Sequence, residues 1–446
     1  MVEQKKWDEM TPAQKREIRF KKWLNPPGVE FVSRKAEENY KARVQRLIDA
    51  IKLKEPDRVP VNLPAGFFPA FYSGGSLEKS MYNYAEMERS WKKYIRDFDG
   101  DTSTSPGLVF PAKMLEIIGH NFHKWPGHGL PSDGAIYQFI EAEYMKAEDY
   151  AQLIRDPSDF WMRNFLPKVA KVFEPFQNLP PLTAMMGIPM GYVGAFANPE
   201  LQEAYKTLFK ASREVVKWGA AVQRINQYAL SHGFPSFSGS MSGAPFDMIA
   251  DMHRGTNGSI MDMYRRPEVL IESLERITPI AIKSALDAAR NTLCPLVQMP
   301  LHKGDDVFMS DKQFEKFYWP TFKRILNALI DDGLVPVPFA EGSYMRRLDY
   351  IKDMRKGTII WWFERVDMAK AKQVLGGRAC IAGNIPVSVM LTGTPQDVKA
   401  ACRRLIETCA PGGGYILTGA ASMNKGSPAN LHAVMEAARE YGTYKR

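Results

Sequence analysis

Apolar positions along the chain follow first a helical period and then an alternation of strands and helices. Thr11-Pro12 is a helix start, an N-cap before proline, and the helix is predicted to end near Leu24. Ser33 begins a second helix with one apolar face, formed by Val44, Leu47, Ile48 and Ile51. Short apolar runs then predict strands at 58–64, 100–104, 181–186, 235–241, 294–300, 335–340, 358–363, 379–384 and 413–418. Helices are predicted between most of them, most clearly at 312–332, 367–375, 395–409 and 428–441.

The strands indicate a parallel sheet. Residues 358–363 are apolar almost throughout, which is typical of a strand covered on both faces. The repeated alternation favours a (β/α)8 TIM barrel, with an open doubly wound sheet as the alternative, although no Gly-x-Gly-x-x-Gly follows the first strand. The stretch 112–234 is too long for one crossover, so we expect an insertion there. The predicted organisation is a helical N-terminal extension at 1–56 and the barrel at 57–446.

Composition narrows these choices. A chain of 446 residues suggests about three domains or one barrel with extensions. The 45% hydrophobic and 24% charged fractions exclude disordered, collagen-like and coiled-coil classes. Four scattered cysteines exclude a disulfide scaffold and a four-thiolate zinc site: Cys294, Cys380, Cys402 and Cys409.

The net charge of +9 is concentrated near the N-terminus. Residues 1–60 hold 15 Lys/Arg and 10 Asp/Glu, so +5 of the +9 lies there. Such an excess attracts nucleic acid, acidic membranes or anionic cofactors, and the alternative is a solvated face of mixed charge. We expect no nucleic-acid partner, and we assign the charge to the outer surface or to a partner protein.

Two segments bear on membranes. The start of the chain is charged through Lys22 and lacks the apolar core of a secretory signal. The uncharged stretch Pro175–Pro199 is long enough to span a bilayer, but its five prolines and three glycines would leave backbone groups unpaired in lipid. We therefore expect a buried strand and loop there, no membrane contact and a cytoplasmic protein.

Polar residues follow many of the predicted strands, where a barrel holds its catalytic groups. The candidates are Asn62, Ser103, Ser105, Ser240, His302, Lys303, Asp305, Asp306, Glu341, Tyr344, Glu364, Asn384, Ser422 and Asn424. Acids on successive strands, such as Asp306, Glu341 and Glu364, would bind a cation or raise one another's pKa. The alternative is that each acid caps the next helix or pairs with a neighbouring base such as Lys303.

Histidine patterns give weaker signals. His302 is predicted to be a base, a metal ligand or a structural histidine. A His-x-x-His-x-x-x-x-His pattern lies on a loop without helical register, which disfavours zinc: His120, His123 and His128. Asp251-Met252-His253-Arg254-Gly255 nearly matches the Asp-x-His-x-x-Gly signature of cobalt-ligating proteins, but its glycine comes one place early. We interpret this segment as a helix end.

Several segments together carry a family resemblance. They include Asp57-Arg58-Val59-Pro60-Val61, Ser242-Gly243-Ala244-Pro245-Phe246, Met263-Tyr264-Arg265-Arg266-Pro267-Glu268, Met309 to Phe317, Gly383-Asn384-Ile385-Pro386, Gly393-Thr394-Pro395 and Gly413-Gly414-Tyr415-Ile416. As a set, spread over residues 40–440, they resemble the uroporphyrinogen decarboxylase superfamily. That resemblance implies a TIM barrel and a relation to corrinoid-dependent methyltransferases.

The family's catalytic motifs are replaced here. Leu63-Pro64-Ala65-Gly66-Phe67 stands where true decarboxylases carry Arg-Gln-Ala-Gly-Arg, and Pro106 stands where they carry the catalytic Asp. The zinc-dependent, thiol-methylating branch needs His-x-Cys-Gly and a later Cys, at which this chain has Phe339-Ala340-Glu341-Gly342 and Ala420. The resemblance therefore implies neither uroporphyrinogen decarboxylation nor thiolate-zinc chemistry. Remaining metal-ligand candidates are Glu341, His302 and Glu364.

The expected barrel mouth is apolar. Aromatic and Met residues near strands and loops either fill the core or line a pocket for a bulky, weakly charged substrate: Phe67, Phe68, Phe71, Met185, Met186, Met190, Tyr192, Trp361 and Trp362. We expect substrate contacts from Phe67, Phe68, Met186, Tyr344, Trp362 and Glu364.

The predicted activity follows from the resemblance. It is transfer of a methyl group between a small organic substrate (a methyl ether, a methylamine-type compound or an aromatic alcohol) and the cobalt of a corrinoid supplied by a separate carrier protein. Glu341, His302 and Asp306 are expected to act as acid or ligand, with Asn384 orienting. The alternatives are a decarboxylase of a non-porphyrin, electron-rich acid and a non-catalytic partner subunit. The resemblance also leaves room for a homodimer.

Overall fold

The N-terminal extension forms two packed helices. The computed structural model describes residues 6–444, so the first five residues of the extension and the last two of the chain lie outside the described residues. A short turn, η1 (Trp7–Glu9), precedes α1 (Pro12–Leu24), and α2 (Arg34–Ile51) follows. Thr11 and Ser33 accept hydrogen bonds from backbone N–H groups of the first turns, so both predicted helix starts are confirmed.

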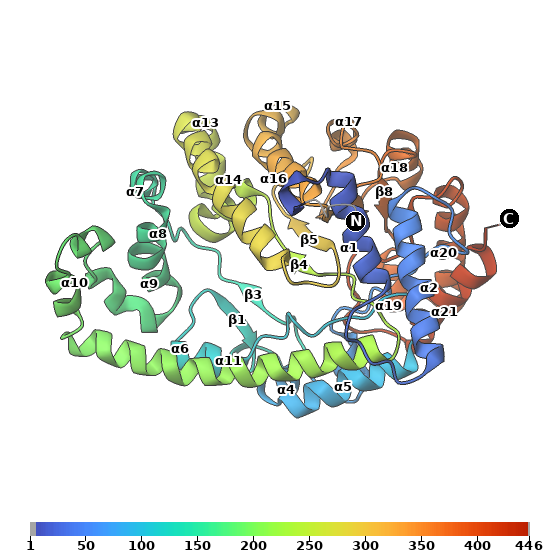
Figure 1. Cartoon of the computed structure of the whole chain (residues 1–446), viewed down its shortest axis with the longest axis horizontal. Coiled ribbons are helices and arrows are strands. Elements are labelled where there is room, and N and C mark those ends of the chain that lie inside the picture. The colour runs from blue at the N-terminus through green and yellow to red at the C-terminus, as the bar shows by residue number, and fades with distance from the viewer. Residues whose placement is uncertain (1–5, 445–446) are drawn as a thin grey trace.

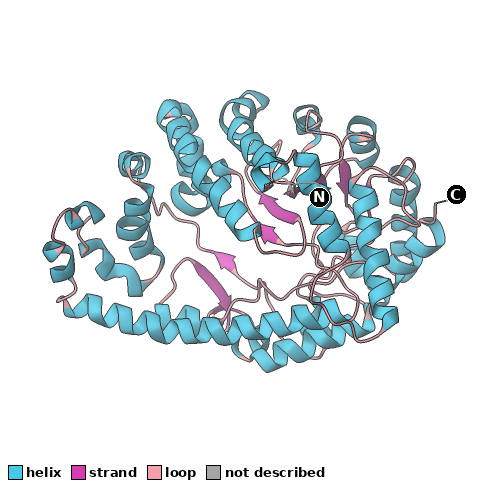
Figure 2. Ribbon diagram, in the orientation of Figure 1, coloured by secondary structure: helices cyan, strands magenta, loops and turns pink. Residues whose placement is uncertain are grey.

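The main sheet is parallel and has the strand order β4-β5-β6-β7-β8-β9, which gives an α/β fold (Figures 1 and 2). Its strands are β4 (Ser240–Met241), β5 (Leu296–Leu301), β6 (Val335–Ala340), β7 (Ile360–Phe363), β8 (Cys380–Ala382) and β9 (Tyr415–Ile416). Six predicted strands are thereby confirmed, most of them shorter than predicted. The strand at 335–340 has the predicted bounds.

The predicted strands at 58–64 and 100–104 are irregular. Val61 forms an isolated parallel bridge with Leu417, and Ser103 forms one with Ser236. Between the two segments, the N–H of Asp101 donates to the carbonyl of Val61 at 2.9 Å. Prolines at positions 60 and 64 lack the N–H groups that a regular ladder requires, which explains the short pairing.

Helices lie between the strands of the main sheet. The predicted helices at 312–332, 367–375, 395–409 and 428–441 are confirmed as α15 (Asp311–Gln313) with η7 (Phe314–Tyr318) and α16 (Trp319–Asp331), α18 (Met368–Leu375), α20 (Pro395–Cys409) and α21 (Pro428–Tyr441). Others are α3 (Phe68–Tyr72), α4 (Leu77–Tyr82), α5 (Tyr84–Asp97), α12 (Pro245–Ile249), η6 (Ala250–Arg254), α13 (Gly255–Arg265), α14 (Pro267–Ala289), η8 (Met345–Arg347), α17 (Leu348–Ile351) and α19 (Val387–Thr392).

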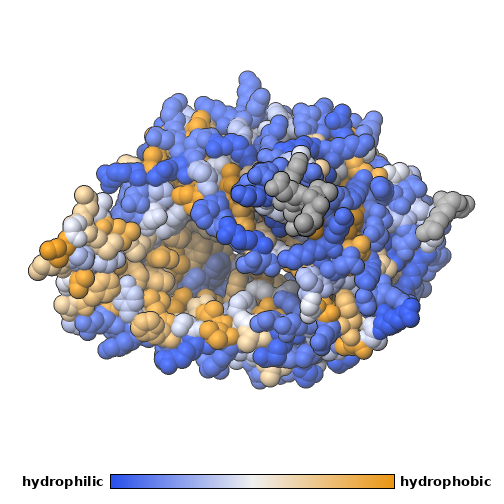
Figure 3. Space-filling model, in the orientation of Figure 1, coloured by the Kyte–Doolittle hydropathy of each residue, from blue (hydrophilic) through white to orange (hydrophobic). Residues whose placement is uncertain are grey.

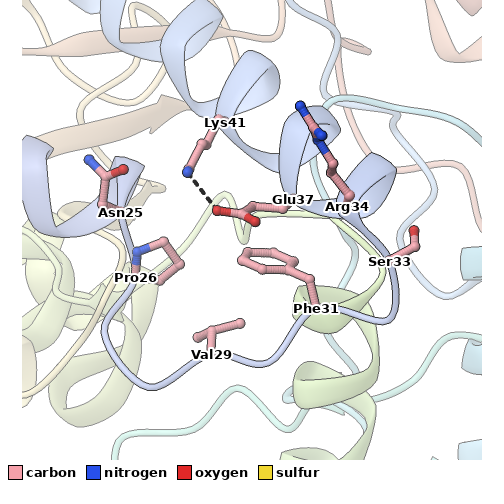
Figure 4. Close-up of a pocket in the computed structure, with 8 residues that line it drawn as sticks. All are labelled: Asn25, Pro26, Val29, Phe31, Ser33, Arg34, Glu37 and Lys41. Atoms are coloured by element: carbon pink, nitrogen blue, oxygen red, sulfur yellow. Dashed lines mark hydrogen bonds and ion pairs between the residues drawn. The ribbon is translucent and has the colours of Figure 1, made fainter.

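The two N-terminal helices cover the amino ends of the strands. Trp23, Tyr40 and Leu47 belong to one buried cluster with the first residues of four strands, Leu296, Val335, Ile360 and Cys380. A shallow depression opens between α1 and α2, where Lys41 pairs with Glu37 at 2.6 Å (Figure 4). The basic extension therefore lies at the end of the sheet opposite the carboxyl ends.

Residues 112–231 form a lobe beside the sheet. It holds a small sheet of β1 (His123–Pro126), β2 (Gly129–Leu130) and β3 (Gln138–Phe139), which lies apart from the main sheet (Figure 2). Its helices are α6 (Ala112–Ile118), η2 (Ala147–Asp149), α7 (Tyr150–Arg155), α8 (Pro157–Phe160), η3 (Trp161–Phe165), α9 (Leu166–Val169), η4 (Lys171–Asn178), η5 (Leu182–Met185), α10 (Met190–Ala195) and α11 (Pro199–Ser231). The 33-residue α11 runs along the bottom of Figure 1 and joins this lobe to the rest of the chain.

One strand prediction and one burial prediction are wrong in the lobe. Residues 182–185 form a 3-10 turn instead of the predicted strand at 181–186. Residues 182–191 are exposed, whereas we expected a buried strand and loop. Prolines at 180, 181 and 189 remove backbone donors, and this segment has no pairing strand among residues 6–444. Within residues 6–444, no helix combines the length and apolar character needed to cross a bilayer.

Candidate active site

Charged side chains gather beyond the carboxyl ends of β5 and β6. His302 and Lys303 follow the last residue of β5, and Glu341 follows β6. Asp247 on α12 and Asp251 on η6 are four residues apart and so lie on one face of a continuous helical segment. These five residues are called the acid–imidazole cluster below.

The imidazole of His302 lies between two carboxylates. Its Nδ1 is 2.5 Å from Oδ2 of Asp251, and its Nε2 is 3.6 Å from Oε1 of Glu341. The hydrogen bond to Asp251, followed by the nearby carboxylate of Glu341, raises the pKa of His302 to about 10, against the opposing effect of burial. His302 is therefore an imidazolium at neutral pH. Because its side chain is 41% exposed, the Nε2–H remains accessible to a ligand.

Asp247 holds the backbone that carries His302. Its two oxygens accept the N–H of His302 at 3.1 Å and the N–H of Lys303 at 2.9 Å. The hydroxyl of Tyr318 donates to the same carboxylate at 2.7 Å. Burial, followed by the nearby charge of Asp251, raises the pKa of Asp247 to about 6. Asp247 is thus a positioning residue whose oxygens are occupied by the protein itself.

Lys303 is committed to neighbouring protein groups. Its ammonium donates to Oγ1 of Thr256 at 3.0 Å and lies 3.5 Å from Oδ1 of Asp251. The thiol, hydroxyl or carboxylate of a substrate would have to compete with both partners for this cation. The cluster as a whole holds three acids and two cationic groups, so it is mildly anionic when all of them are ionised.

The lobe reaches over this cluster. Oε1 of Glu141 accepts the N–H of Thr256 at 2.6 Å, and the N–H of Met145 donates to the carbonyl of His253 at 2.8 Å. The charge of Glu341 contributes to a raised pKa of Tyr137, second to burial, so these two side chains are near one another. Figure 3 shows a hollow bounded by apolar and pale surface where Figure 1 places β3 between α11 and α14.

Of the four predicted catalytic residues, two lie together in the structure and two lie elsewhere. His302 and Glu341 lie together, whereas Asp306 accepts the hydroxyl of Ser343 at 2.8 Å and the N–H of Arg346 at 3.1 Å. Asp306 thereby shapes the loop after β6. The side-chain amide of Asn384 donates to the carbonyls of residues 364 and 366, so it orients the loop after β7.

The predicted substrate contacts are also dispersed. Glu364 accepts the N–H of Gly342 at 2.6 Å, which places it next to Glu341. Trp362 packs on Phe339 with ring centres 4.6 Å apart and donates its Nε1–H to the carbonyl of residue 419. Tyr344 is buried beside Gly304. A Cβ atom added at Gly304 would lie only 2.6 Å from the hydroxyl oxygen of Tyr344.

Two of the predicted aromatic contacts lie near the first strand, and Met186 lies far along the lobe. Phe68 belongs to the core and packs edge-on against Tyr94 and Phe98. Phe67 is half-buried, and its N–H donates to Asn424 at 3.1 Å. Met186 lies between η5 and α10, at the end of the lobe farthest from the main sheet in Figure 1, and its side chain is exposed.

The donor set does not fit a metal ion. Among residues 6–444, no three His, Cys, Asp or Glu side chains come together as a metal site. Nδ1 of His302 is already engaged by Asp251, and Glu364 is engaged by the backbone of Gly342. His120 and His123 face each other with ring nitrogens 3.0 Å apart, while His128 stacks on Trp125.

His253 is a structural histidine. Its Nδ1 lies 2.9 Å from the carbonyl oxygen of Met248, and its Nε2 accepts the indole N–H of Trp161 at 2.8 Å. Burial lowers the pKa of His253 to about 4. Both ring nitrogens are occupied, so this histidine has none free for cobalt. The helical backbone is interrupted at Gly255, whose φ is 69°, and α13 begins there, so the predicted helix end is confirmed.

Two residues of the cluster were missed in the sequence. In the sequence, Asp251 stands only within the cobalt-ligating signature, and Asp247 belongs to none of the candidate sets. The two acids are four residues apart and come directly after the strand-end segment Ser242-Gly243-Ala244-Pro245. This spacing places both carboxylates on one helix face, which turns toward the end of the next strand.

Comparisons with known proteins agree on one family. Residues 214–441 match the family model of uroporphyrinogen decarboxylase. The fold is similar to that of a methyltransferase from Methanosarcina mazei, with a TM-score of 0.57, 15% identity, and coverage of 90% of this chain and 98% of the other.

Two curated relatives have different activities. A methylcobamide:CoM methyltransferase of Methanosarcina mazei is 30% identical over 129 residues, which is 29% of this chain and 37% of the relative. A uroporphyrinogen decarboxylase of Syntrophotalea carbinolica is 25% identical over 179 residues, which is 39% of this chain and 50% of the relative. The aligned segments thus span half of these relatives or less.

Proposed function

The chain belongs to the uroporphyrinogen decarboxylase family, and from this premise we propose that it is a corrinoid-dependent methyltransferase. Its reaction moves a methyl group between a small, weakly charged organic substrate and the cobalt of a corrinoid held by a separate carrier protein. The similarity to a methylcobamide:CoM methyltransferase supports the reaction class. The observation that carries the proposal is the position of the His302 imidazole, which lies between Asp251 and Glu341 with its side chain partly exposed.

The proposed scaffold is a (β/α)8 barrel with an insertion. Segments 59–63 and 101–103 are its first two strands, since they bridge β9 on one side and the residues before β4 on the other. We place the barrel at 57–446, the insertion at about 112–234 and the helical extension at 1–56. In this scaffold the acid–imidazole cluster lies at the carboxyl ends of the strands, the end that carries catalytic groups in such barrels.

His302 is the proposed proton donor. When a methyl group leaves a substrate oxygen or nitrogen, that atom gains an electron pair and needs a proton. The Nε2–H of His302 supplies this proton, and Asp251 retains the Nδ1–H and the ring orientation. The 3.6 Å between Nε2 and Glu341 exceeds a hydrogen-bond distance, which leaves the donor free for a substrate atom. In the reverse direction, neutral His302 accepts the proton of the methyl acceptor.

The corrinoid is a second substrate in this scheme. A reduced corrinoid supplies the nucleophile that accepts the methyl group, and a methylated one supplies the methyl group in the reverse direction. His253 has both ring nitrogens occupied, which supports a corrinoid delivered by a carrier instead of one ligated by this chain. The role of this chain's own residues is to orient the substrate and to move the proton.

A thiol acceptor activated by zinc does not fit this site. Zinc lowers the pKa of a bound thiol, and it requires deprotonated nitrogen or sulfur ligands. Here the imidazole next to Glu341 is protonated, and all four cysteines are buried, each with a pKa raised by burial. We therefore assign no step to a metal ion.

Near the acid–imidazole cluster, the decarboxylase alternative lacks a cation that is free of carboxylate neighbours, since His302 itself lies between Asp251 and Glu341. A carboxylate substrate needs a positive partner, but Lys303 is committed to Thr256 and Asp251, and Arg365 lies beside Glu364 with most of its side chain in solvent. The third alternative, a non-catalytic partner subunit, gives no reason for a protonated histidine with an accessible N–H. The cluster thus favours methyl transfer over both.

Methyl transfer can be followed in the visible spectrum of the cobalt. We expect the full chain, incubated with reduced cobalamin and a neutral methyl donor such as a methyl ether or a methylated amine, to accelerate the appearance of the methylcobalamin spectrum. His302→Gln should remove this acceleration. His232→Gln is the matched control, because His232 lies at the end of α11 and contacts the carbonyl of Tyr228. Release of CO2 from an electron-rich acid, with no change at cobalt for any methyl donor, would replace this proposal with the decarboxylase.

A further inference from the structure

One face of the main sheet opens toward the carboxyl ends of its strands. In β5 to β9, every residue is buried except four that are partly exposed: Gln298, Pro300, Phe339 and Trp362. Successive side chains of a strand point to opposite faces, so these four share the face on which Leu296, Val335 and Ile360 pack with the N-terminal helices. This face, called the inner face below, is therefore closed at the amino ends of the strands and open near their carboxyl ends.

The open part of the inner face is lined by rings and a thioether. Pro300, Phe339 and Trp362 lie side by side, because they are paired in register across three strands. The ring centres of Phe339 and Trp362 are 4.6 Å apart, and the indole N–H of Trp362 donates to the carbonyl of residue 419 at 2.8 Å, which fixes its ring. On β4, Met241 is in register with Gln298 and is 49% exposed. Met241, Pro300, Phe339 and Trp362 are called the apolar floor below.

The acid–imidazole cluster borders this floor. His302 comes two positions after Pro300, and Glu341 comes two positions after Phe339, so both follow floor residues toward the carboxyl ends of the strands. The two side chains lie 3.6 Å apart at their nearest nitrogen and oxygen. A ligand that rests on the floor therefore has one edge at an imidazole and a carboxylate.

The lobe contributes a further ring beside the cluster. Tyr137 directly precedes β3, which borders the hollow seen in Figure 3, and its side chain is 40% exposed. Burial, followed by the charge of Glu341, raises the pKa of Tyr137, which places its hydroxyl near that carboxylate. The ring is held by Phe110 and His123, whose ring centres lie 5.8 Å and 5.2 Å from its own. Tyr137 thus offers a fixed aromatic surface next to Glu341.

We propose that the apolar floor and Tyr137 bind an aromatic ring, so that the methyl donor is an aryl methyl ether. This inference rests on the proposed function, because it names the substrate class of the same site. Aromatic rings pack favourably on one another, and a thioether such as that of Met241 packs favourably against a ring. The interior of an eight-stranded barrel holds one small ligand, so a single ring fits the proposed scaffold and a corrin macrocycle does not.

A methylated ammonium ion is the alternative occupant, since cations bind over the faces of aromatic rings. A site of that kind surrounds one centre with separate rings. Phe339 and Trp362 instead pack against each other and present one continuous surface, which suits a flat, apolar ligand.

Isothermal titration calorimetry of the full chain with anisole tests the site without cobalt. Cyclohexyl methyl ether is the matched ligand, because it carries the same methyl ether on a saturated ring. We expect anisole to bind at least about 10-fold more tightly, and Phe339→Leu and Tyr137→Leu each to weaken its binding by about 3- to 10-fold, the effect of one aromatic pair. Tyr264→Leu is the control, since Tyr264 is exposed in the last turn of α13 and should leave both affinities unchanged. Far-UV circular dichroism and thermal melting verify that each variant is folded.

Equal affinities for the two ethers, or anisole binding that both leucine variants leave unchanged, would overturn the aromatic site. Tighter binding of tetramethylammonium than of anisole would assign the rings to a cation instead. The proposed function fails in a different way. Anisole that binds as expected but yields no methylcobalamin with reduced cobalamin would support the ring site and remove methyl transfer, whereas methyl transfer from an aliphatic donor without anisole binding would overturn the ring site alone.

Discussion

Two clusters of acidic and basic side chains lie at opposite ends of the main sheet, and they differ in how completely they are paired. At the amino ends, Asp101 is fully buried and binds Arg46, Arg58 and the N–H of Val61 at 2.7–2.8 Å. At the carboxyl ends, His302 is 41% exposed and keeps one N–H facing Glu341 across 3.6 Å. The first cluster is saturated and holds the fold together. The second has an unsatisfied, accessible donor, which is the property that catalysis requires.

Substitution of His302, in the cluster at the carboxyl ends, should reduce activity without reducing stability. We expect His302→Gln to lower kcat for methyl transfer by about 10²–10⁴-fold, the range for loss of a general acid or base. The melting temperature should change little, because the side chain is partly exposed and its loss leaves no buried cavity. Single-turnover kinetics and thermal melting measure the two effects. A variant that loses stability instead of activity would make His302 a structural residue.

Substitution of Asp101 should have the reverse outcome. Asp101→Ala leaves Arg58 without its acidic partner and Arg46 with Asp57 alone, so we expect unfolding to require about 3–5 kcal/mol less free energy. The activity per folded molecule should remain near the wild-type value. Urea denaturation measures the first quantity and activity normalised to the folded fraction measures the second. Loss of activity in a fully folded variant would remove the distinction between the two clusters.

Loss of Asp251 should move the pH dependence of the reaction. The hydrogen bond to Asp251 is the largest cause of the raised pKa of His302, about 10 against an ordinary 6.5. Wild-type activity that needs protonated His302 should therefore persist up to about pH 10, and in Asp251→Asn it should decline at lower pH. The same raised pKa stabilises the fold fully below pH 6.5, and this contribution is lost as the pH rises through about 10. Identical alkaline limits in both proteins would exclude Asp251 as the partner.

The smallest effect on stability is expected for an exposed ion pair. Lys41 and Glu37 pair at 2.6 Å in the depression between α1 and α2, with more than two fifths of each side chain in solvent (Figure 4). Glu37→Gln should change the free energy of unfolding by less than about 0.5 kcal/mol, since exposed pairs on helices contribute little. Urea denaturation in low and high salt provides the measurement. A larger effect would show that the extension contributes to stability through charge as well as through its apolar contacts.

Secondary structure is predicted most accurately from the sequence where the residues of a single segment are enough to determine its conformation. Residues 335–340 are apolar throughout and form β6 with the predicted bounds, and Thr11 begins α1 as predicted. Residues 181–186 are also mostly apolar but pair with no strand in the described part of the chain, and proline alone does not decide the outcome, since β6 itself contains Pro336 and Pro338. Local pattern alone does not distinguish these two cases.

The candidate site was predicted only in part because it depends on contacts between distant segments. His302 and Glu341 follow strands, so their place at the carboxyl ends follows from the alternation of strands and helices. Asp251 meets His302 across 51 positions of the chain, and its direction is set by the phase of the preceding helix. Asp306 has the same predicted status as Glu341 but turns into the loop that contains Ser343. Side-chain direction after a strand end depends on the loop, which periodicity does not describe.

The protonation state of His302 tests the central claim most directly. Nitrogen-15 NMR of the full chain, with the His302 signal assigned by its absence in His302→Gln, measures the titration of this ring among the seven histidines of the chain. The account predicts an imidazolium throughout the neutral range, titrating with a pKa of about 10. A His302 that titrates at its ordinary value near 6.5 would contradict the role of Asp251 and Glu341 and would remove the proposed proton donor.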